Sequence, residues 1–342
     1  MKRILVRAPN WIGDQVMAYP FFSQLRLSYP NAWIAVVCTE WVKDIQFKGF
    51  VNEVFILPKF NKRSLLNSFR SILRISEVLK EKGPWDLGIL LPNSFGSALL
   101  FYLAKVKSVR GYVTDARGYF LKEKLNWNPD PAIHRADTYL NLLQKEGLVN
   151  GSAKEYLKKF DPVKHWPEVI PQELPKDPYI VIAPGATADS RRWSAEKFGD
   201  LIEQIHTKWG FRSVIVGGVA ERSVAEGFKS RNLPILDYTG KGGVSSLWKI
   251  FLNAQFTICN ESGLAHVAAL SGSRVQIICG AADPKRTMPI GPGKVQVLTN
   301  TSVSCWPCEK NICQFTDERK NQCHEGLTSL AVVQEVERGI GG

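Results

Sequence analysis

The chain has 342 residues, 44% of them hydrophobic and 22% charged, which is typical of a globular protein with two domains. It has no run of 18 apolar residues, and its start lacks the apolar core and cleavage site of a secretion signal, so we expect a cytoplasmic protein without a membrane span. The net charge of +12 is compatible with nucleic acid, an anionic membrane surface or an acidic substrate, but no nucleic-acid-binding signature accompanies it, so we expect no nucleic acid partner.

Short apolar runs typical of buried strands alternate with helical patterns along the chain. The runs are residues 4–6, 33–37, 54–57, 87–91 and 109–112, then 179–183, 213–216, 256–259, 275–278 and 295–298. Such alternation predicts parallel, doubly wound α/β sheets. Residues 161–178 separate the two series and contain five prolines, which indicates a semi-rigid linker. We therefore predict two Rossmann-like domains, residues 1–165 and 166–342, with a ligand cleft between them.

The segment 7–15 joins the first predicted strand to a helix through a turn that contains Gly13. Asp14 follows this glycine at the start of the helix, where the helix dipole stabilises a carboxylate. An ionised carboxylate there suits a general base, although a plain helix cap explains the same pattern. The segment has no G-x-G-x-x-G, so it does not indicate a dinucleotide site of the dehydrogenase type.

A basic amphipathic helix with a basic entry loop is predicted within residues 59–82. Seven Lys and Arg residues lie in this stretch, and its leucine, isoleucine and phenylalanine residues recur near helical spacing. Lys62 and Arg63 lie at its start. Either the helix presents an ordinary solvated face, or its cations attract an anionic partner.

In the second series, residues 184–187 (Pro-Gly-Ala-Thr) follow a predicted strand and lead to Arg191 and Arg192. A turn of small residues with the Thr187 hydroxyl, followed by two guanidinium groups, suits a diphosphate. One such turn alone is a weak signal, so its weight depends on the other turns of the same domain.

Residues 260–266 (Asn-Glu-Ser-Gly-Leu-Ala-His) follow another predicted strand and open a helix. Free backbone N–H groups and the helix dipole make such a place suitable for a phosphate. Glu261 is an acceptor for sugar hydroxyls beside it, and His266 lies one turn into the helix. An N-cap by Ser262, with His266 merely hydrogen-bonded nearby, explains the same residues without a ligand.

Seven cysteines divide into two groups. Three lie in or beside predicted strands and are expected to be small buried apolar residues: Cys38, Cys259 and Cys279. The other four are spaced C-x2-C-x4-C-x9-C: Cys305, Cys308, Cys313 and Cys323. This spacing predicts either a structural zinc site, for which His324 is a spare ligand, or reduced thiols, or a redox or iron–sulfur role.

Together these motifs resemble the ADP-heptose:lipopolysaccharide heptosyltransferase family, and within it the heptosyltransferase II group of the inner core. The resemblance covers nearly the whole chain and rests on residues 11–14, 91–99, 184–186, 191–193, 260–269, 280–284 and 289–292. It implies a GT-B glycosyltransferase fold, an acceptor-binding first domain and a nucleotide-sugar-binding second domain. It also implies that the last helix, about residues 329–338, returns toward the first domain.

The resemblance assigns roles to individual residues. Asp14 corresponds to the family's proposed general base, and Glu221 to an acidic residue at the nucleoside. The phosphate-binding positions correspond to Ser262, Gly263 and His266. Arg191 stands where the family usually has a lysine at the donor phosphates, and Glu261 replaces the usual aspartate at the heptose hydroxyls. Both departures keep the charge but change the reach, which leaves room for a different sugar donor.

The expected reaction is a single displacement that inverts the anomeric carbon as heptose passes from ADP-L-glycero-D-manno-heptose to the inner core of lipopolysaccharide. Asp14 would take the proton of the acceptor hydroxyl. Arg191, the N–H groups of residues 262–263 and His266 would stabilise the leaving diphosphate. Because these donors can replace a divalent ion, we expect no cofactor in catalysis.

The expected acceptor is the lipid A–core at the cytoplasmic face of the inner membrane, which a protein without a membrane span must capture peripherally. Its inner core carries carboxylates and phosphates, so we expect cationic contacts from Lys62, Arg63 and Arg117. Arg117 lies in a loop after the fifth predicted strand, and such loops face the ligand edge of a parallel sheet.

Other classes of function stay open at this point. The chain could be a related GT-B glycosyltransferase with another nucleotide sugar or acceptor. A nucleotide-sugar epimerase would need acid and base residues on both faces of the sugar, and only Asp14 is evident. A binding protein with a degenerate transferase fold would be favoured by loss of Asp14 or of the phosphate turns, and neither is lost.

Overall fold

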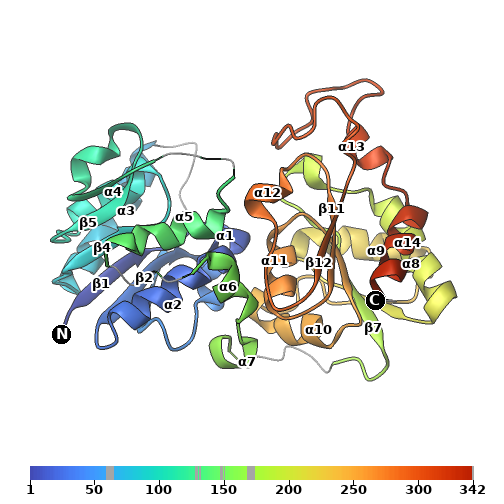
Figure 1. The fold of residues 1–342 in the computed structure, drawn as a ribbon, viewed down its shortest axis with the longest axis horizontal. Coiled ribbons are helices and arrows are strands. Elements are labelled where there is room, and N and C mark those ends of the chain that lie inside the picture. The colour runs from blue at the N-terminus through green and yellow to red at the C-terminus, as the bar shows by residue number, and fades with distance from the viewer. Residues whose placement is uncertain are drawn as a thin grey trace. The chain divides into compact units, whose positions relative to one another are not determined.

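The computed structural model describes residues 1–58, 65–127, 130, 132–146, 149, 151–167 and 174–340 (Figure 1). The chain divides into two compact units, Met1–Leu157 with Val163–Pro167, and Lys158–Pro162 with Glu168–Gly342. The boundary predicted after residue 165 falls inside the short stretch that ends the first unit.

The first unit is built on a parallel six-stranded sheet in the order β3-β2-β1-β4-β5-β6. Its strands are β1 (Arg3–Arg7), β2 (Trp33–Thr39), β3 (Glu53–Leu57), β4 (Leu87–Leu90), β5 (Val109–Val113) and β6 (Glu123–Asn126). Its helical segments are α1 (Ile12–Met17), α2 (Tyr19–Ser28), η1 (Glu40–Ile45), α3 (Leu65–Glu81), α4 (Phe95–Leu103), η2 (Asp115–Phe120), α5 (Arg135–Leu140) and η3 (Asn141–Glu146).

The apolar strands of the first unit form the middle of its core. β4 is buried along its whole length, which is typical of a parallel strand covered on both faces. Helices α3 and α4 pack together, and α1 and α2 pack with α5. Leu5, Val37 and Phe101 belong to one buried cluster around Trp85, whose indole N–H donates to the Leu79 carbonyl oxygen at 2.6 Å.

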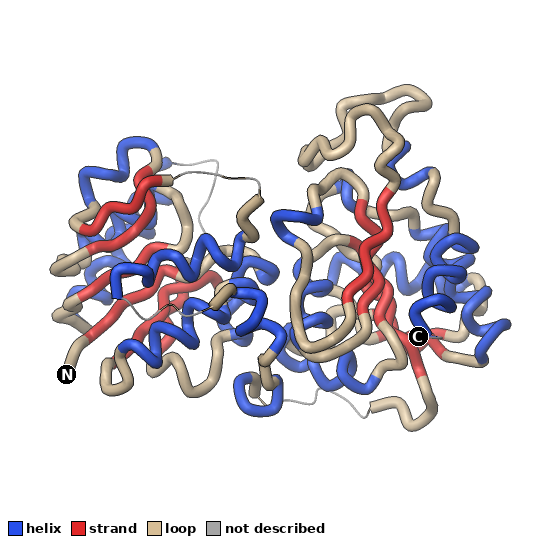
Figure 2. The backbone as a smooth tube through the Cα atoms, in the orientation of Figure 1, coloured by secondary structure: helices blue, strands red, loops and turns tan. Residues whose placement is uncertain are grey.

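The second unit repeats this architecture with the strand order β12-β11-β10-β7-β8-β9, again entirely parallel. Its strands are β7 (Tyr179–Ala183), β8 (Arg212–Ile215), β9 (Ile235–Asp237), β10 (Thr257–Asn260), β11 (Val275–Cys279) and β12 (Val295–Thr299). Its helical segments are η4 (Asp189–Arg191), α8 (Ala195–Trp209), η5 (Val219–Glu221), α9 (Arg222–Ser230), η6 (Val244–Ser246), α10 (Trp248–Asn253), α11 (Gly263–Leu270), α12 (Pro284–Thr287), α13 (Gln322–Glu325) and α14 (Ser329–Ile340). Figure 2 shows strands in the middle of each unit and helices around them.

The predicted α/β alternation is confirmed, because each apolar run lies on an observed strand. Two edge strands, β6 and β9, were not predicted. The residues of β9 are all half-buried, and those of β6 alternate between half-buried and exposed, so neither has a continuous apolar run. Cys38, Cys259 and Cys279 are fully buried, as expected for strand residues.

The last helix belongs to the core of the second unit. α14 packs on α8, and its residues Val332, Val333 and Val336 are buried in the cluster that contains Phe198. The amphipathic face of α14 is therefore occupied by its own unit. The expectation that this helix returns toward the first domain stays a prediction.

Part of the predicted linker is folded structure. Residues Pro162–His165 form the short helix α7, which follows α6 (Ala153–Lys158). The His165 ring lies against that of Phe50 in a tilted arrangement with centroids 4.7 Å apart, and Trp166 is buried. Proline at the first helical position is well tolerated, so proline density alone did not separate this helix from a linker. Residues 168–173 of the predicted linker lie outside the described residues.

Within the described residues, no helix is long and apolar enough to cross a membrane.

Candidate active site

The phosphate-type turns of the second unit meet at one edge of its sheet. β7 lies between β10 and β8, and all three strands are parallel, so the turns that follow them share the carboxyl edge. Asn260 joins two of these turns: its Nδ2 donates to the Pro184 carbonyl oxygen at 2.6 Å, and the Trp193 N–H donates to its Oδ1 at 3.0 Å. This fully buried amide fixes the turns after β7 and β10 relative to each other.

Arg191 and Glu261 are brought together by the same arrangement. Arg191 Nη1 lies 3.2 Å from Glu261 Oε1. Glu261 is buried, and this burial raises the pKa of its carboxyl to about 7, against the opposing attraction of Arg191. The negative charge of Glu309 acts in the same direction as burial. Two of the predicted donor residues, Arg191 and Glu261, therefore form an ion pair at a poorly hydrated site.

Three polar atoms of this cluster are buried without a hydrogen-bond partner in the described part of the chain: Arg191 Nε, Glu261 Oε2 and Ser262 Oγ. Ser262 occupies the N-cap position of α11, but its side chain makes no capping hydrogen bond. The plain N-cap interpretation of Ser262 therefore finds no support. Native proteins leave few buried polar atoms unpaired, so these atoms are available to a polar ligand or to bound water.

Glu221 lies against the neighbouring turns. Its Oε2 accepts a hydrogen bond from the Gly218 N–H at 2.8 Å. A Cβ placed on Gly185 would lie 2.6 Å from Glu221 Oε1, and one placed on Gly217 would lie 2.7 Å from Glu221 Cβ. The glycines after β7 and β8 thus make room for this carboxylate beside the turns that follow these two strands.

The remaining predicted donor residues lie on the same turns. Thr187 is exposed in the turn after β7, and Gly263 begins α11 and is half-buried. His266 is buried one turn into α11. The structure therefore places all the predicted donor residues on the turns after β7, β8 and β10 or on the helix that follows β10.

The cysteine-rich segment that follows β12 and includes α13 braces the turn that contains Arg191. The Ser190 N–H donates to the Asn311 carbonyl oxygen at 3.2 Å, and His324 Nε2 lies 3.0 Å from the Ser190 carbonyl oxygen. A Cβ on Gly280 would lie 2.2 Å from His324 Nε2, so glycine is required beside this ring. His324, noted from the sequence as a spare metal ligand, is instead packed as a brace for the donor turn.

The four cysteines of this segment are half-buried and unpaired by disulfides. Burial raises the pKa of Cys323 to about 11, and its interactions with the neighbouring Cys308, Cys305 and Cys313 act in the same direction. Across the described residues, however, no three His, Cys, Asp or Glu side chains are placed to hold a metal ion. As positioned, these side chains do not fit zinc, and the zinc site stays a prediction.

In the first unit, Asp14 lies in the first turn of α1 and is half-buried. The Tyr139 hydroxyl donates a hydrogen bond to Asp14 Oδ1 at 2.8 Å. Burial, and then the charge of Asp14, raises the pKa of Tyr139 well above its usual range, so the phenol stays protonated and remains a donor. A hydrogen bond to a carboxylate favours its ionised form, as a base requires.

The turn before α1 is held by a buried arginine. Arg7 Nη1 donates to the Val37 carbonyl oxygen at 3.2 Å, and Arg7 Nη2 donates to the Asn10 side chain. Trp41 Nε1 donates to the Asn10 carbonyl oxygen at 2.6 Å. Burial lowers the pKa of Arg7 to about 10. Neither Arg7 nor Tyr139 was identified from the sequence: Tyr139 lies 125 positions from Asp14 and carries no local signal.

Of the three predicted acceptor contacts, only Arg117 lies within the described residues. Arg117 is fully buried, and it donates to the Tyr112 and Pro92 carbonyl oxygens at 2.7 and 2.6 Å. It therefore ties the ends of β4 and β5 together, and we withdraw it as an acceptor contact. Lys62 and Arg63 lie outside the described residues.

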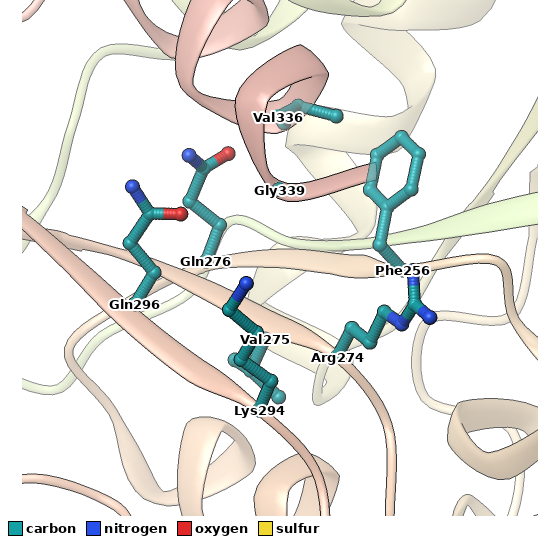
Figure 3. A pocket seen from close by; sticks show the side chains of 8 residues that line it. All are labelled: Phe256, Arg274, Val275, Gln276, Lys294, Gln296, Val336 and Gly339. Carbon is teal, nitrogen blue, oxygen red and sulfur yellow. The ribbon is translucent and has the colours of Figure 1, made fainter. Parts of the chain in front are cut away.

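A small, mainly apolar pocket in the second unit is remote from these turns (Figure 3). Phe256, Val275 and Lys294 line it, and they lie at the amino ends of β10, β11 and β12. The donor turns lie at the opposite, carboxyl ends of this sheet. The pocket is therefore not part of the candidate active site.

Comparison with known proteins places these residues in context. The family description "Glycosyltransferase family 9 (heptosyltransferase)" matches residues 72–317. Lipooligosaccharide heptosyltransferase 2 of Haemophilus influenzae is 25% identical over 304 residues, which cover 84% of this chain and 86% of that protein. Lipopolysaccharide heptosyltransferase 2 of Escherichia coli is 23% identical over 312 residues, 84% of this chain and 85% of that protein.

Among solved structures, the E. coli ADP-heptose LPS heptosyltransferase II superposes with a TM-score of 0.76 at 21% identity, covering 99% of this chain and 98% of that one. The glycosyl transferase family 9 structure from Veillonella parvula superposes with a TM-score of 0.77 at 19% identity, covering 99% and 97%. These likenesses show the fold, and they confirm the predicted GT-B arrangement of two Rossmann-like domains.

Proposed function

Because the chain belongs to glycosyltransferase family 9, the heptosyltransferases, we propose that it transfers heptose from ADP-L-glycero-D-manno-heptose to the inner core of lipopolysaccharide. Membership of this family makes the chain a transferase rather than a nucleotide-sugar epimerase or a binding module. The curated relatives bear the names of lipooligosaccharide and lipopolysaccharide heptosyltransferases 2, which supports this donor and acceptor.

One observation carries the assignment of the donor site. The unpaired buried atoms of Arg191, Glu261 and Ser262 lie at the carboxyl edge of a parallel sheet, where such folds bind nucleotides. Arg191 and the N–H groups at the start of α11 suit a diphosphate, and Glu261 suits sugar hydroxyls. We assign the nucleoside side to Glu221, and the phosphate side to Thr187, Ser262, Gly263 and His266.

The proton chemistry is assigned to the first unit. Asp14 accepts the proton of the attacking acceptor hydroxyl, while Tyr139 holds the carboxylate in orientation. The hydroxyl oxygen bonds to the anomeric carbon as the bond to ADP breaks, so the configuration inverts. Arg191 and the α11 N–H groups stabilise the negative charge that develops on ADP. We propose that this positive charge suffices for transfer without a metal ion, which activity in excess EDTA would test.

The acceptor side is proposed on chemical grounds. A lipid-linked inner core is anchored in a membrane, and its carboxylates and phosphates favour a cationic partner. We therefore propose peripheral association with the cytoplasmic face of the inner membrane. Lys62 and Arg63 remain candidates for acceptor contact on sequence grounds.

The transfer assay that tests this function uses purified protein, truncated lipopolysaccharides of stepwise inner-core length, and ADP-heptose beside other nucleotide sugars. Mass spectrometry should show one added heptose with ADP-heptose on a particular truncation, together with release of ADP. Transfer from a different nucleotide sugar alone would favour the alternative donor that Arg191 and Glu261 leave open. No transfer to any truncation would refute the proposal.

A further inference from the structure

The positive charge of the chain is concentrated in its first half. Residues 1–167 contain 25 Lys and Arg and 14 Asp and Glu, a net charge of +11. Residues 168–342 contain 19 and 18, a net charge of +1. The nucleotide-binding unit is thus almost neutral, and an anionic partner larger than the donor is attracted to the first unit.

Three neighbouring elements of the first unit expose large apolar side chains. Helix α3 exposes 47% of Phe69 and 38% of Leu73, α4 exposes 45% of Phe95 and 60% of Tyr102, and η2 exposes 92% of Tyr119. We call these five residues the aromatic face. Single exposed apolar residues are ordinary, whereas a contiguous group of aromatic side chains marks an interaction surface.

The three elements that carry the aromatic face pack on one another. Helices α3 and α4 pack together (Figure 1). A Cβ on Gly96 would lie 3.7 Å from Ile72 Cδ1. α4 packs on η2 through Phe120, whose ring centroid lies 5.4 Å from that of Phe95 and 5.1 Å from that of Tyr102. The exposed rings therefore stand on folded, mutually packed elements rather than on separate loops.

Cations border this face. Arg70 and Arg74 are exposed on α3 next in sequence to Phe69 and Leu73, and the described residues give neither of them an ion pair. Exposed lysines follow the other two elements, Lys105 after α4 and Lys122 after η2. The first ten residues of α3 contain no Asp or Glu. Aromatic rings beside Arg and Lys are the combination that binds the interface of an anionic bilayer.

We propose that the aromatic face of α3, α4 and η2 docks the first unit on an anionic lipid surface. The rings of Phe69, Tyr102 and Tyr119 enter the headgroup region, while Arg70 and Arg74 contact lipid phosphates. Each cation near such a surface increases binding roughly five-fold at low salt. Salt screens the attraction between these arginines and the lipid phosphates, so vesicle binding weakens as the salt concentration rises.

The position of this face relates it to the proposed reaction. α4 follows β4, η2 follows β5, and the helix that contains Asp14 follows β1, so all three begin at the carboxyl edge of one parallel sheet. A membrane-embedded acceptor would be presented at the edge that holds the base. This last step rests on the proposed transferase function; the docking itself does not.

Vesicle co-sedimentation tests the docking independently of catalysis. The full chain is mixed with phosphatidylcholine vesicles, with or without phosphatidylglycerol. We expect binding that requires the anionic lipid and falls with salt. Phe69→Ser with Tyr119→Ser should lower the vesicle partition coefficient about ten-fold or more, as should Arg70→Glu with Arg74→Glu.

Matched controls come from the second unit. Ile312 and Leu330 are 73% and 58% exposed, so Ile312→Ser with Leu330→Ser removes comparable apolar surface. Arg274→Glu with Lys294→Glu reverses two exposed cations there. Both controls should bind vesicles as the wild type does. Tyr119→Ser alone, at a position that is almost fully exposed, provides a variant whose fold is not at risk.

The outcomes separate docking from catalysis. If both proposals hold, Phe69→Ser with Tyr119→Ser loses transfer to vesicle-embedded acceptor but keeps kcat on a delipidated acceptor in solution. If no acceptor is used but vesicle binding still depends on these residues, only the transferase proposal fails. Absence of vesicle binding by the wild type, or equal losses in the second-unit controls, would overturn the docking.

Discussion

Replacing Glu261 by glutamine should stabilise the protein at alkaline pH, although it removes one partner of an ion pair. Burial raises the pKa of Glu261 to about 7 from an ordinary value of 4.5. The folded state therefore binds this proton more tightly than the unfolded state does. Its stabilising contribution is complete below about pH 4.5 and is lost as the pH rises through about 7.

The size of the effect follows from the shift in pKa. Each unit corresponds to about 1.4 kcal/mol, so the ionised carboxylate lowers the free energy of unfolding by up to about 3 kcal/mol above pH 7. Glutamine keeps the shape without the charge. Arg191 loses its partner, but its side chain is 31% exposed and reaches water. We expect Glu261→Gln to be more stable than wild type by about 1–3 kcal/mol at pH 8, and by much less at pH 5.

Urea unfolding at pH 5 and pH 8 measures this difference directly. Glu318→Gln, which removes an exposed carboxylate of the same unit, serves as the control and should show little difference at either pH. Glu261→Gln should also raise the donor KM, because the sugar hydroxyls lose a charged acceptor. An equal stability change at both pH values would show that the Glu261 carboxyl is not held in a charge-disfavouring environment.

Three further changes test separate parts of the account. Tyr139→Phe removes the hydrogen bond that orients the Asp14 carboxylate, so kcat should fall by roughly ten-fold while the donor KM stays unchanged; an unchanged kcat would assign the tyrosine to packing. Arg191→Ala should weaken ADP binding in calorimetry by ~1–3 kcal/mol, whereas Arg212→Ala, at the amino end of β8, should not; equal affinities would remove the arginine from the phosphate site. Elemental analysis decides between the two interpretations of the cysteine segment: about one zinc per chain, lost in Cys305→Ser with Cys308→Ser, would support the zinc site predicted from the spacing, whereas the observed positions of the described side chains predict metal-free protein whose Tm is unchanged in that variant.

Strands and turns could be predicted from the sequence where the local residue pattern matches the topology of the sheet. Continuous apolar runs identified the buried strands, such as Tyr179–Ala183, because a parallel strand covered on both faces needs apolar residues throughout. The turns after β7 and β10 could be assigned to one site because adjacent parallel strands end at one edge. Edge strand β6 was not predicted, because a strand with one neighbour and an exposed face needs no continuous apolar run.

Other features depend on tertiary contacts that no local pattern encodes. Arg117 was expected to face an acceptor, but its guanidinium donates to the carbonyl oxygens of Pro92 and Tyr112, which come together only in the folded sheet. Tyr139 reaches Asp14 across the fold of the first unit. The last helix showed an apolar face, but the periodicity of that face does not say which surface covers it. In each case the partner of the side chain could be found only from the structure.

The assignment of Asp14 as the base that accepts the acceptor proton is tested most directly by the single-turnover rate of heptose transfer. Asp14→Asn is compared with wild type and with Asp44→Asn, an exposed aspartate of the same unit, at saturating ADP-heptose. We predict that Asp14→Asn lowers the rate by ~10²–10⁴ and leaves donor affinity nearly unchanged, while Asp44→Asn transfers at the wild-type rate. Wild-type turnover by Asp14→Asn would contradict the account.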